Sequence, residues 1–324
     1  MREALFCVAE NDRIRCRLCP HNCLIPEGRY GICRHRKNIE GKLFADGYGK
    51  VSSVAIDPIE KKPLYHFHPG GAILSVGGLW CNLRCSFCQN WHISQMKQAT
   101  THMDPGKLLD MSLEYNSVGI AFTYNEPIIW YEYVLDTARL FKEKGLKTVM
   151  VTNGFIRPEP LEELLSFVDA FNIDVKAFNA EFYKKICGGD LAAVKQTVEM
   201  CAKKSHVEVT TLIIGSLNDD VQEIKGLARW LAEIDKNIPL HLSRYHPDYH
   251  MELPATPVDV LHRLRRSAGE YLNYVYIGNV IGADNNTYCP ECGNKIVERG
   301  YYISITGLKE GKCSRCKSAI PITM

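Results

Sequence analysis

The sequence has no run of 18 apolar residues, and its first residues, MREALFCVAENDR, lack the apolar core of a secretory signal peptide. A helix needs a run of about that length to cross a bilayer. The sequence also has no strong excess of one charge, because its 39 Lys and Arg residues nearly balance its 37 Asp and Glu residues and leave a net charge of +2. We therefore expect a cytoplasmic protein that binds neither membranes nor nucleic acid.

Two phosphate-binding motifs are also missing. No G-x-G-x-x-G follows a predicted strand, and there is no P-loop. Both motifs use backbone amides to hold phosphate groups, so their absence argues against a dehydrogenase or a kinase. A hydrophobic content of 46% and a charged content of 23% are typical of a globular enzyme-sized protein.

Cysteine, by contrast, is abundant, with 14 residues among 324. In a reducing compartment so many cysteines are expected to bind metals rather than to form disulfides. Eleven of them fall into three clusters, which supports that interpretation. Cys7, Cys187 and Cys201 have no partner nearby in sequence, and we interpret them as ordinary thiols.

The most informative cluster is CNLRCSFC, which contains Cys81, Cys85 and Cys88 with Phe87 before the last cysteine. Three thiolates on so tight a turn can hold a 4Fe–4S cluster and leave one of its four irons without a protein ligand. A small molecule can chelate that iron and accept an electron. The alternative is three ordinary buried cysteines, but this spacing seldom arises by chance.

Two further cysteine clusters predict closed metal sites. The first has the spacing C-x2-C-x3-C-x9-C and can hold zinc or an auxiliary iron–sulfur cluster; its members are Cys16, Cys19, Cys23 and Cys33. The second has two C-x2-C pairs, which predict a zinc ribbon or a rubredoxin-like iron site; its members are Cys289, Cys292, Cys313 and Cys316. A tail this short needs such a metal to fold.

The order of apolar runs predicts the fold class. Short apolar runs alternate with amphipathic stretches and predict parallel strands over 72–76, 118–122, 146–151, 169–175, 206–214, 239–243 and 273–277. The sequence therefore predicts an α/β fold with a complete or partial barrel of six or more such strands. We expect a Cys-rich N-terminal module over 1–70, the barrel over 71–279 and a zinc-ribbon-like tail over 288–324. Ligands should gather at the carboxyl ends of the strands, where the CNLRCSFC loop lies.

The cysteine loop and its surroundings resemble a known family. CNLRCSFC is the signature of the radical S-adenosylmethionine (radical SAM) enzymes. KVSSVAIDPIEKKPLYHFHPG, CQNWHISQ, AFTYNEP and CPECG make the chain similar to the radical SAM enzyme of the AmmeMemoRadiSam system. The chain resembles the pyruvate formate-lyase activating enzymes more distantly. The resemblance implies a 4Fe–4S cluster and SAM, which is cleaved to a 5′-deoxyadenosyl radical that removes a hydrogen atom from a substrate.

Polar residues after the predicted strands are candidates for binding SAM. They are Glu126 in YNEP, Asn153 in VTNG, Asp174 and Lys176 in DVK, and His246 in RYHP. Tyr124 and Asn125 stand where the activating enzymes have glycines, and Val151 where they have an aspartate. Each candidate also has a structural interpretation. Glu126 can cap a helix, Asn153 can shape a turn, Asp174 and Lys176 can form an ion pair, and His246 can be a loop residue.

The resemblance leaves the substrate open. One possibility is a small molecule handled together with Memo-like and AMMECR1-like proteins, and another is a glycyl hydrogen of a partner enzyme, as in glycyl-radical activases. An electron donor such as ferredoxin or flavodoxin is implied in both cases. A hypothesis of another class is a non-catalytic metal or redox sensor. A sensor would need no SAM site, so Glu126, Asn153 and Asp174 argue against it.

Overall fold

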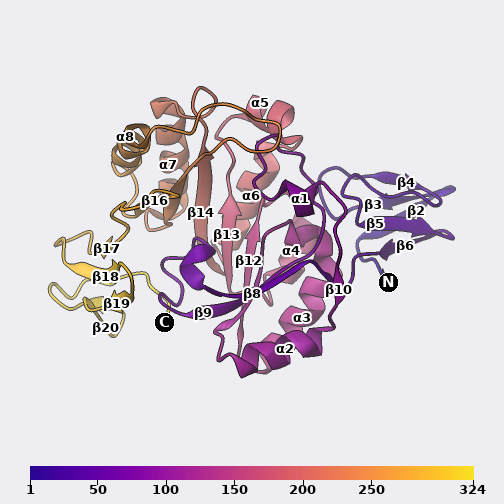
Figure 1. The fold of residues 1–324 in the computed structure, drawn as a ribbon, viewed down its shortest axis with the longest axis horizontal. Coiled ribbons are helices and arrows are strands. Elements are labelled where there is room, and N and C mark those ends of the chain that lie inside the picture. Colours follow the sequence, from indigo (N-terminus) through magenta and orange to yellow (C-terminus); the bar gives the residue numbers. More distant parts are fainter.

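Helical crossovers join the central strands, and such connections make neighbouring strands parallel. The computed structural model describes residues 1–324 and has one eight-stranded sheet in the order β16-β15-β14-β13-β12-β11-β9-β8 (Figure 1). Its strands are β8 (Ser53–Pro58), β9 (Ala72–Gly77), β11 (Gly119–Phe122), β12 (Lys147–Thr152), β13 (Ala170–Asp174), β14 (His206–Ile213), β15 (Leu240–Arg244) and β16 (Val275–Gly278).

The seven strands from β9 to β16 are parallel, and β8 runs antiparallel to β9 at one edge. The edge strands β8 and β16 do not pair with each other, so the barrel is partial. This confirms the predicted fold class. The sheet begins with β8, before residue 71, where the sequence placed the start of the barrel.

The crossovers and loops contain the helices. They are α1 (Trp91–Ser94), α2 (Pro105–Glu114), α3 (Tyr131–Glu143), α4 (Pro158–Leu164), α5 (Ala180–Phe182), α6 (Leu191–Cys201), α7 (Val221–Asp235), α8 (Val258–Ala268), the short 3-10 helices η1 (Ile59–Lys61) and η2 (Pro127–Trp130), and the π-helix η3 (Tyr183–Cys187). The strands and helices enclose a core of 62 buried residues.

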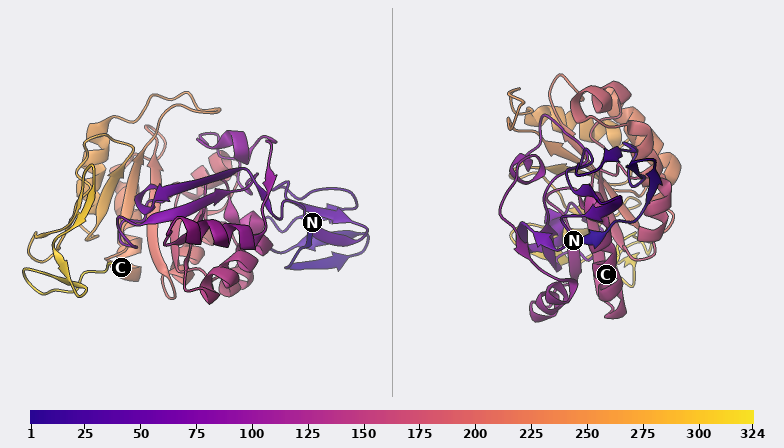
Figure 2. Two further views of the ribbon diagram at one scale, coloured as in Figure 1. Left: turned by 60° about the horizontal axis from the view of Figure 1, so that its bottom comes forward. Right: turned by 90° about the vertical axis from the view of Figure 1, so that its right-hand side faces the viewer.

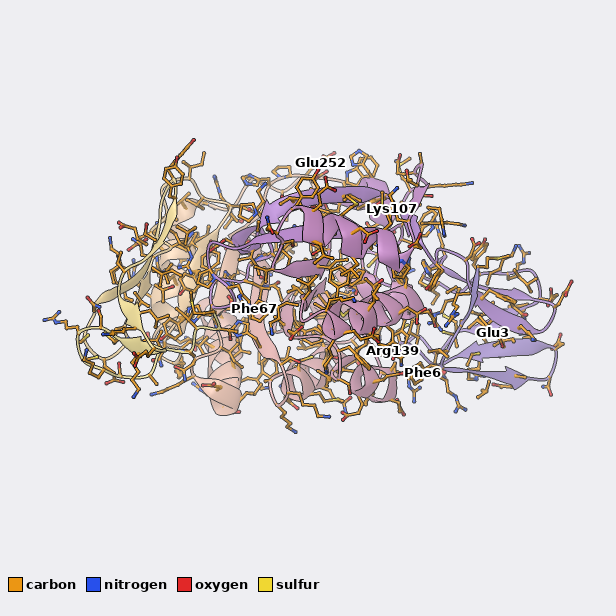
Figure 3. The ribbon with its side chains drawn as sticks, turned by 90° about the horizontal axis from the view of Figure 1, so that it is seen from below. Glu3, Phe6, Phe67, Lys107, Arg139 and Glu252 are labelled. Atoms are coloured by element: carbon orange, nitrogen blue, oxygen red, sulfur yellow. The ribbon has the colours of Figure 1, made fainter.

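Two small β structures form the N-terminal module. One sheet contains β2 (Cys7–Glu10), β3 (Arg13–Cys16) and β4 (Leu24–Pro26), and the other contains β1 (Arg2–Glu3), β6 (Lys42–Ala45) and β5 (Arg36–Ile39). A separate pair, β7 (Lys50–Val51) with β10 (Thr101–His102), follows. Phe6 packs edge-on against Tyr131 of α3, with 5.3 Å between ring centroids (Figure 3). Beside them, Arg36 forms an ion pair with Glu132, and their side chains are only 1% and 2% exposed.

The C-terminal tail lies at the opposite end of the long axis from the N-terminal module (Figure 2). Its strands are β17 (Thr287–Tyr288), β18 (Lys295–Arg299), β19 (Ile303–Ile305), β20 (Leu308–Lys309) and β21 (Lys312–Cys313). It has its own core of five buried residues. It is also tied to the segment after η1, because the backbone N–H of His68 donates to Thr323 at 2.7 Å and that of Thr323 to His66 at 2.9 Å.

A buried polar network lies near the amino ends of the central strands. Glu208 of β14 is fully buried and accepts hydrogen bonds from His241 Nε2 at 2.6 Å, His206 Nε2 at 2.9 Å and the backbone N–H of His66 at 2.7 Å. Burial alone would raise the pKa of Glu208, but the hydrogen bonds from the two histidines hold it well below its usual range.

None of the helices has the length and apolar character needed to cross a membrane.

The pair of Arg36 and Glu132 yields a test of how firmly the module is attached. Glu132→Ala leaves the guanidinium buried without its partner, which costs about 3–5 kcal/mol of unfolding free energy. We expect a clearly lower urea midpoint, measured by circular dichroism. The exposed pair of Glu181 and Lys185, with side chains 68% and 69% exposed, provides the control, since Glu181→Ala should leave the midpoint unchanged. Equal midpoints for both variants would contradict this account.

Candidate functional site

The loop with Cys81, Cys85 and Cys88 directly follows β9, at the carboxyl ends of the parallel strands. The π-helix η3 accepts two backbone hydrogen bonds from this loop. The N–H of Arg84 donates to the carbonyl of Cys187 at 2.9 Å, and the N–H of Ser86 donates to the carbonyl of Ile186 at 3.4 Å. π-helical turns often occur at functional sites. The structure therefore fixes this loop by backbone contacts that do not involve its thiols.

Two of the three thiols have polar neighbours. The Sγ of Cys81 accepts from the backbone N–H of Leu83 at 3.3 Å and from Asn153 Nδ2 at 3.5 Å. The Sγ of Cys88 lies 3.1 Å from Ser94 Oγ. Burial raises the pKa values of Cys81 and Cys88, so neither thiol loses its proton readily by itself. A metal ion that replaces the proton removes this cost.

These three sulfurs do not converge tightly enough for a single ion. The structure contains one group of three or more metal-ligating side chains whose ligand atoms all lie within 4.8 Å of one another, and it is in the tail. A cluster of several irons attaches each thiolate at a different iron, so it needs the sulfurs farther apart. The donor set of three separated soft sulfurs thus fits an iron–sulfur cluster.

Glu126 connects the ends of two neighbouring strands. It is 2% exposed, and its carboxylate accepts from Thr152 Oγ1 at 2.6 Å and the backbone N–H groups of Asn153 at 2.8 Å and Ile128 at 2.9 Å. The last bond caps η2, so the structural role considered for Glu126 is present. Burial raises its pKa to about 7 despite these hydrogen bonds, and its charge in turn contributes to the raised pKa of Cys81.

Asn153 lies between Glu126 and the cysteine loop. Its side-chain Nδ2 donates to Cys81 Sγ and, at 2.9 Å, to Asn82 Oδ1, while its Oδ1 accepts from the backbone N–H of Phe155 at 2.9 Å. It therefore shapes the turn after β12, as the structural interpretation proposed, and it also contacts a thiol.

Asp174 and Lys176 form an ion pair at the end of β13, with 2.6 Å between Asp174 Oδ2 and Lys176 Nζ. Burial opposes the charge of Lys176, but Asp174 and the thiols of Cys85 and Cys187 raise its pKa overall. The ammonium group therefore stays charged and faces the cysteine loop. The structure thus brings Cys81, Cys85 and Cys88 together with these four strand-end residues.

His246 is not part of this group. It is exposed and has no side-chain hydrogen bond. Its neighbours contact the cysteine loop instead: Asp248 accepts from Trp91 Nε1 at 3.0 Å, Tyr249 stacks on Trp91 at 5.3 Å between ring centroids, and the N–H of His250 donates to Ser86 at 3.0 Å. A contact of His246 with a ligand stays a prediction.

Sequence reasoning missed two residues of the site. We interpreted Cys187 as an ordinary thiol, but a hydrogen bond between its side chain and Cys85 is the main cause of the raised pKa of Cys85. Ser94, at the end of α1, lies beside Cys88. Cys187 is too distant in sequence for any spacing to reveal it, whereas Ser94 follows the loop closely enough to have been a candidate.

The tail cysteines converge as a single metal ion requires. The Sγ atoms of Cys289 and Cys316 are 3.5 Å apart, and those of Cys292 and Cys313 are 3.7 Å apart. Tetrahedral zinc with Zn–S bonds of about 2.3 Å places its sulfurs roughly 3.8 Å apart. This group could bind zinc.

The four N-terminal cysteines are spread over the loops of their module. Cys16 ends β3, Cys19 and Cys23 lie between β3 and β4, and Cys33 precedes β5. All are buried except Cys23, which is half-buried, and none forms a disulfide.

A family model described as the radical SAM superfamily matches residues 76–231, from the end of β9 into α7. Over its whole length the chain is also 43% identical to the uncharacterized protein MJ0808 of Methanocaldococcus jannaschii, which it covers completely. Residues 76–231 therefore form a radical SAM superfamily domain.

More distant relatives agree with this assignment. The chain is 28% identical to the pyruvate formate-lyase-activating enzyme of Clostridium pasteurianum over 174 residues, which is 51% of this chain and 72% of that enzyme. The crystal structure of Streptococcus suis SuiB bound to S-adenosylmethionine matches with a TM-score of 0.51 and 13% identity, over 62% of this chain and 48% of that one, which indicates a shared fold. Because members of this superfamily are enzymes, the chain is an enzyme, and its radical SAM domain implies a 4Fe–4S cluster and SAM.

The tail yields a prediction about its metal. Because its core has five residues against 62 in the main core, the tail should depend on zinc and the barrel should not. Cys292→Ser with Cys316→Ser should remove one zinc per chain and speed hydrogen exchange over 288–324, with little change in the barrel. Cys7→Ser, at a cysteine outside the clusters, is the control. Normal exchange in a zinc-free tail would show that the ribbon folds without metal.

Proposed function

We propose that this radical SAM enzyme cleaves SAM reductively at a 4Fe–4S cluster held by Cys81, Cys85 and Cys88, and that the products serve to remove a hydrogen atom from a substrate. When bound, the cluster supplies the single electron that splits SAM into methionine and a 5′-deoxyadenosyl radical. The observation that carries the proposal is the convergence of polar side chains from three strand ends on this loop.

The surrounding residues have distinct roles in this proposal. Glu126 binds the ammonium group of SAM, since its buried carboxylate already points its two oxygens toward N–H and O–H donors beside Cys81. Lys176 binds the carboxylate of SAM, and Asp174 holds Lys176 in place at 2.6 Å. Asn153 orients Cys81 through its Nδ2. His246 contacts the adenine only if its loop moves inward.

The chain's similarity to an activating enzyme supports a second candidate, activation of a glycyl-radical enzyme. In that case the hydrogen atom comes from a glycine of a protein partner rather than from a small molecule. The sequence resemblance to the AmmeMemoRadiSam enzymes, which implies Memo-like and AMMECR1-like partners, favours the small molecule. A ferredoxin or flavodoxin serves as reductant in both. A glycyl-radical signal in the electron paramagnetic resonance (EPR) spectrum of a partner enzyme would decide for the second candidate.

The reaction itself can be tested directly. With dithionite and no substrate, the anaerobic protein should convert SAM slowly to 5′-deoxyadenosine and methionine, measured by liquid chromatography. The variant with Cys81→Ala, Cys85→Ala and Cys88→Ala should form neither product, yet remain folded, because Cys85 is only one of the 62 buried residues of the core and the other two lie at its edge. Methylthioadenosine or S-adenosylhomocysteine as the sole product would contradict the proposed cleavage.

Glu126 provides a test of SAM binding. Glu126→Gln replaces a charge-assisted hydrogen bond worth roughly 1.5–3 kcal/mol, so the affinity for SAM should fall by about ten- to a hundredfold while the iron content stays constant. Glu114→Gln, at an exposed carboxylate, is the matched control. Calorimetry would measure both. An unchanged affinity of the Glu126 variant would leave Glu126 with its capping role alone.

The raised pKa of Glu126, about 7, adds a pH dependence. Below this pH the carboxyl group is mostly protonated and neutral, and above it the group is charged and attracts the ammonium of SAM. Between pH 8 and pH 6 the charged fraction falls about tenfold, and the affinity of the wild-type protein for SAM should fall with it. Glu126→Gln should remove this pH dependence. If the affinity of the variant for SAM still changes with pH, another titratable group causes the dependence.

A further inference from the structure

The N-terminal cysteines are close neighbours in space although the structure leaves them unpaired. The backbone N–H of Cys16 donates to the carbonyl of Cys23 at 2.8 Å, and Cys19 lies on the loop between these two residues. Arg36, three residues after Cys33, places its Nη1 4.0 Å from Cys16 Sγ. The fold thus gathers these four thiols, none of which forms a disulfide, into one part of the module.

The spacing of their sulfurs distinguishes one ion from several. In the tail, all four cysteine sulfurs lie within 4.8 Å of one another, as zinc requires, but no three of the N-terminal sulfurs do. The loop with Cys81, Cys85 and Cys88, for which we propose a 4Fe–4S cluster, shows the same wider spacing. In the spacing of their sulfurs, the N-terminal cysteines therefore resemble the loop proposed to hold a 4Fe–4S cluster and differ from the tail cysteines.

Hydrogen-bond donors point at these sulfurs. The backbone N–H of His21 donates to Cys19, that of Ile32 to Cys23, and those of His35 and Arg36 to Cys33. Nη1 of Arg36 also lies 4.0 Å from Cys16 Sγ. Donors of this kind stabilise negatively charged sulfur and tune iron–sulfur clusters.

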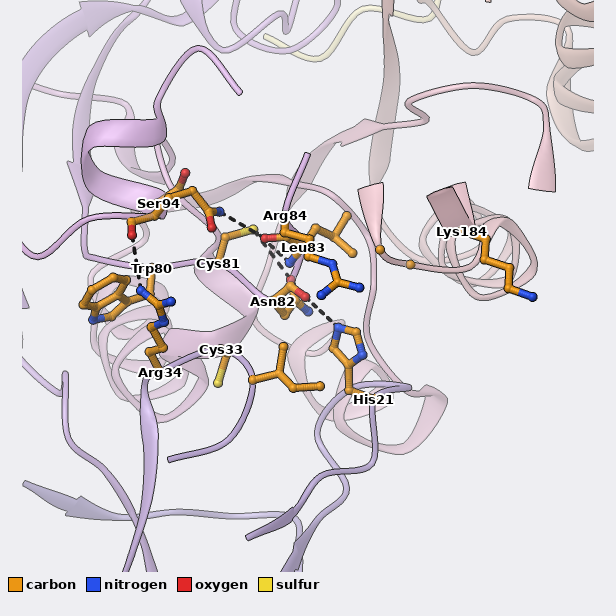
Figure 4. A pocket seen from close by; sticks show the side chains of 14 residues that line it. His21, Cys33, Arg34, Trp80, Cys81, Asn82, Leu83, Arg84, Ser94 and Lys184 are labelled. Atoms are coloured by element: carbon orange, nitrogen blue, oxygen red, sulfur yellow. Dashed lines mark hydrogen bonds between the residues drawn. The ribbon is translucent and has the colours of Figure 1, made fainter. Parts of the chain in front are cut away.

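The N-terminal group lies next to the catalytic loop. A cavity of about 480 Å³ separates the two and is lined on one side by Cys33 and on the other by Cys81 (Figure 4). His21, between Cys19 and Cys23, is hydrogen-bonded through Nε2 to the carbonyl of Asn82, the residue after Cys81, at 2.6 Å. A short path of bonds therefore connects the loops of the two cysteine groups.

We propose that Cys16, Cys19, Cys23 and Cys33 hold a second iron–sulfur cluster, which passes electrons to the catalytic one. Four thiolates leave no iron open for a substrate, so the second cluster can carry electrons but cannot bind SAM. A low-potential one-electron protein donor reduces it; it then gives the same electron to the catalytic cluster and returns to its oxidised state, with no transfer of atoms. This relay role rests on the proposed function, whereas the presence of the cluster does not.

The presence of the second cluster is tested in the variant with Cys81→Ala, Cys85→Ala and Cys88→Ala, which leaves the N-terminal module intact. After anaerobic reconstitution it should retain about two to four irons per chain with an equal amount of sulfide, and an EPR signal after reduction. Adding Cys16→Ser and Cys33→Ser should remove both. A triple variant without iron and sulfide, or one with two zinc ions per chain, would overturn the proposal.

The relay role has a separate test. In Cys16→Ser with Cys33→Ser, the ratio of flavodoxin-supported to dithionite-supported formation of 5′-deoxyadenosine should fall at least tenfold, because dithionite can reduce the catalytic cluster without a relay. An unchanged ratio would refute electron transfer through this site. Absence of 5′-deoxyadenosine from the wild-type protein with dithionite would instead refute the proposed cleavage, so the two failures are distinguishable.

Discussion

A buried sulfur can be a thiolate only where positive charge compensates it, and this requirement governs the rim of the barrel. Burial raises the pKa of Cys81 and of Cys88, and Glu126 adds a further negative charge beside Cys81. The charged Lys176 faces Cys85 and offsets part of this cost. Bound cations would stabilise the thiolates and the carboxylate of this rim, which is the electrostatic condition for holding iron and a sulfonium cofactor.

The same requirement separates the two ends of the molecule. In the tail, four sulfurs gather around one point and supply most of what holds a five-residue core together. In the N-terminal module, the sulfurs are farther apart, and the module is attached to the barrel by the buried pair of Arg36 and Glu132 and by Phe6. We therefore expect the tail to depend on a metal for folding, while the module has a packed attachment of its own.

Much of the fold could be predicted from sequence because each central strand is a short apolar run between helical stretches. The predicted strand over 206–214, for example, corresponds to β14 at His206–Ile213. The start of α2 is encoded in the same local way, with Pro105 at its first position and Asp104 accepting from the N–H of Lys107. Both features depend on local sequence alone.

Other features could not be predicted because they depend on contacts between distant segments. β8 joins the sheet through β9, so no local pattern indicated where the barrel begins. The contact of Cys187 with Cys85 and the hydrogen bonds of Glu126 to the next strand arise only after folding. The exposed position of His246 depends on the path of its loop, which the motif RYHP does not determine.

The π-helix η3 has a consequence for the maturation of the enzyme. Its carbonyls at Ile186 and Cys187 accept hydrogen bonds from backbone N–H groups of the cysteine loop, so contacts that do not involve the thiols help to fix the shape of the loop. A receptor shaped in advance spends no binding energy on ordering its own chain. Insertion of the catalytic cluster should therefore require little rearrangement of this loop, whereas the tail, with its five-residue core, should gain much of its order from a metal.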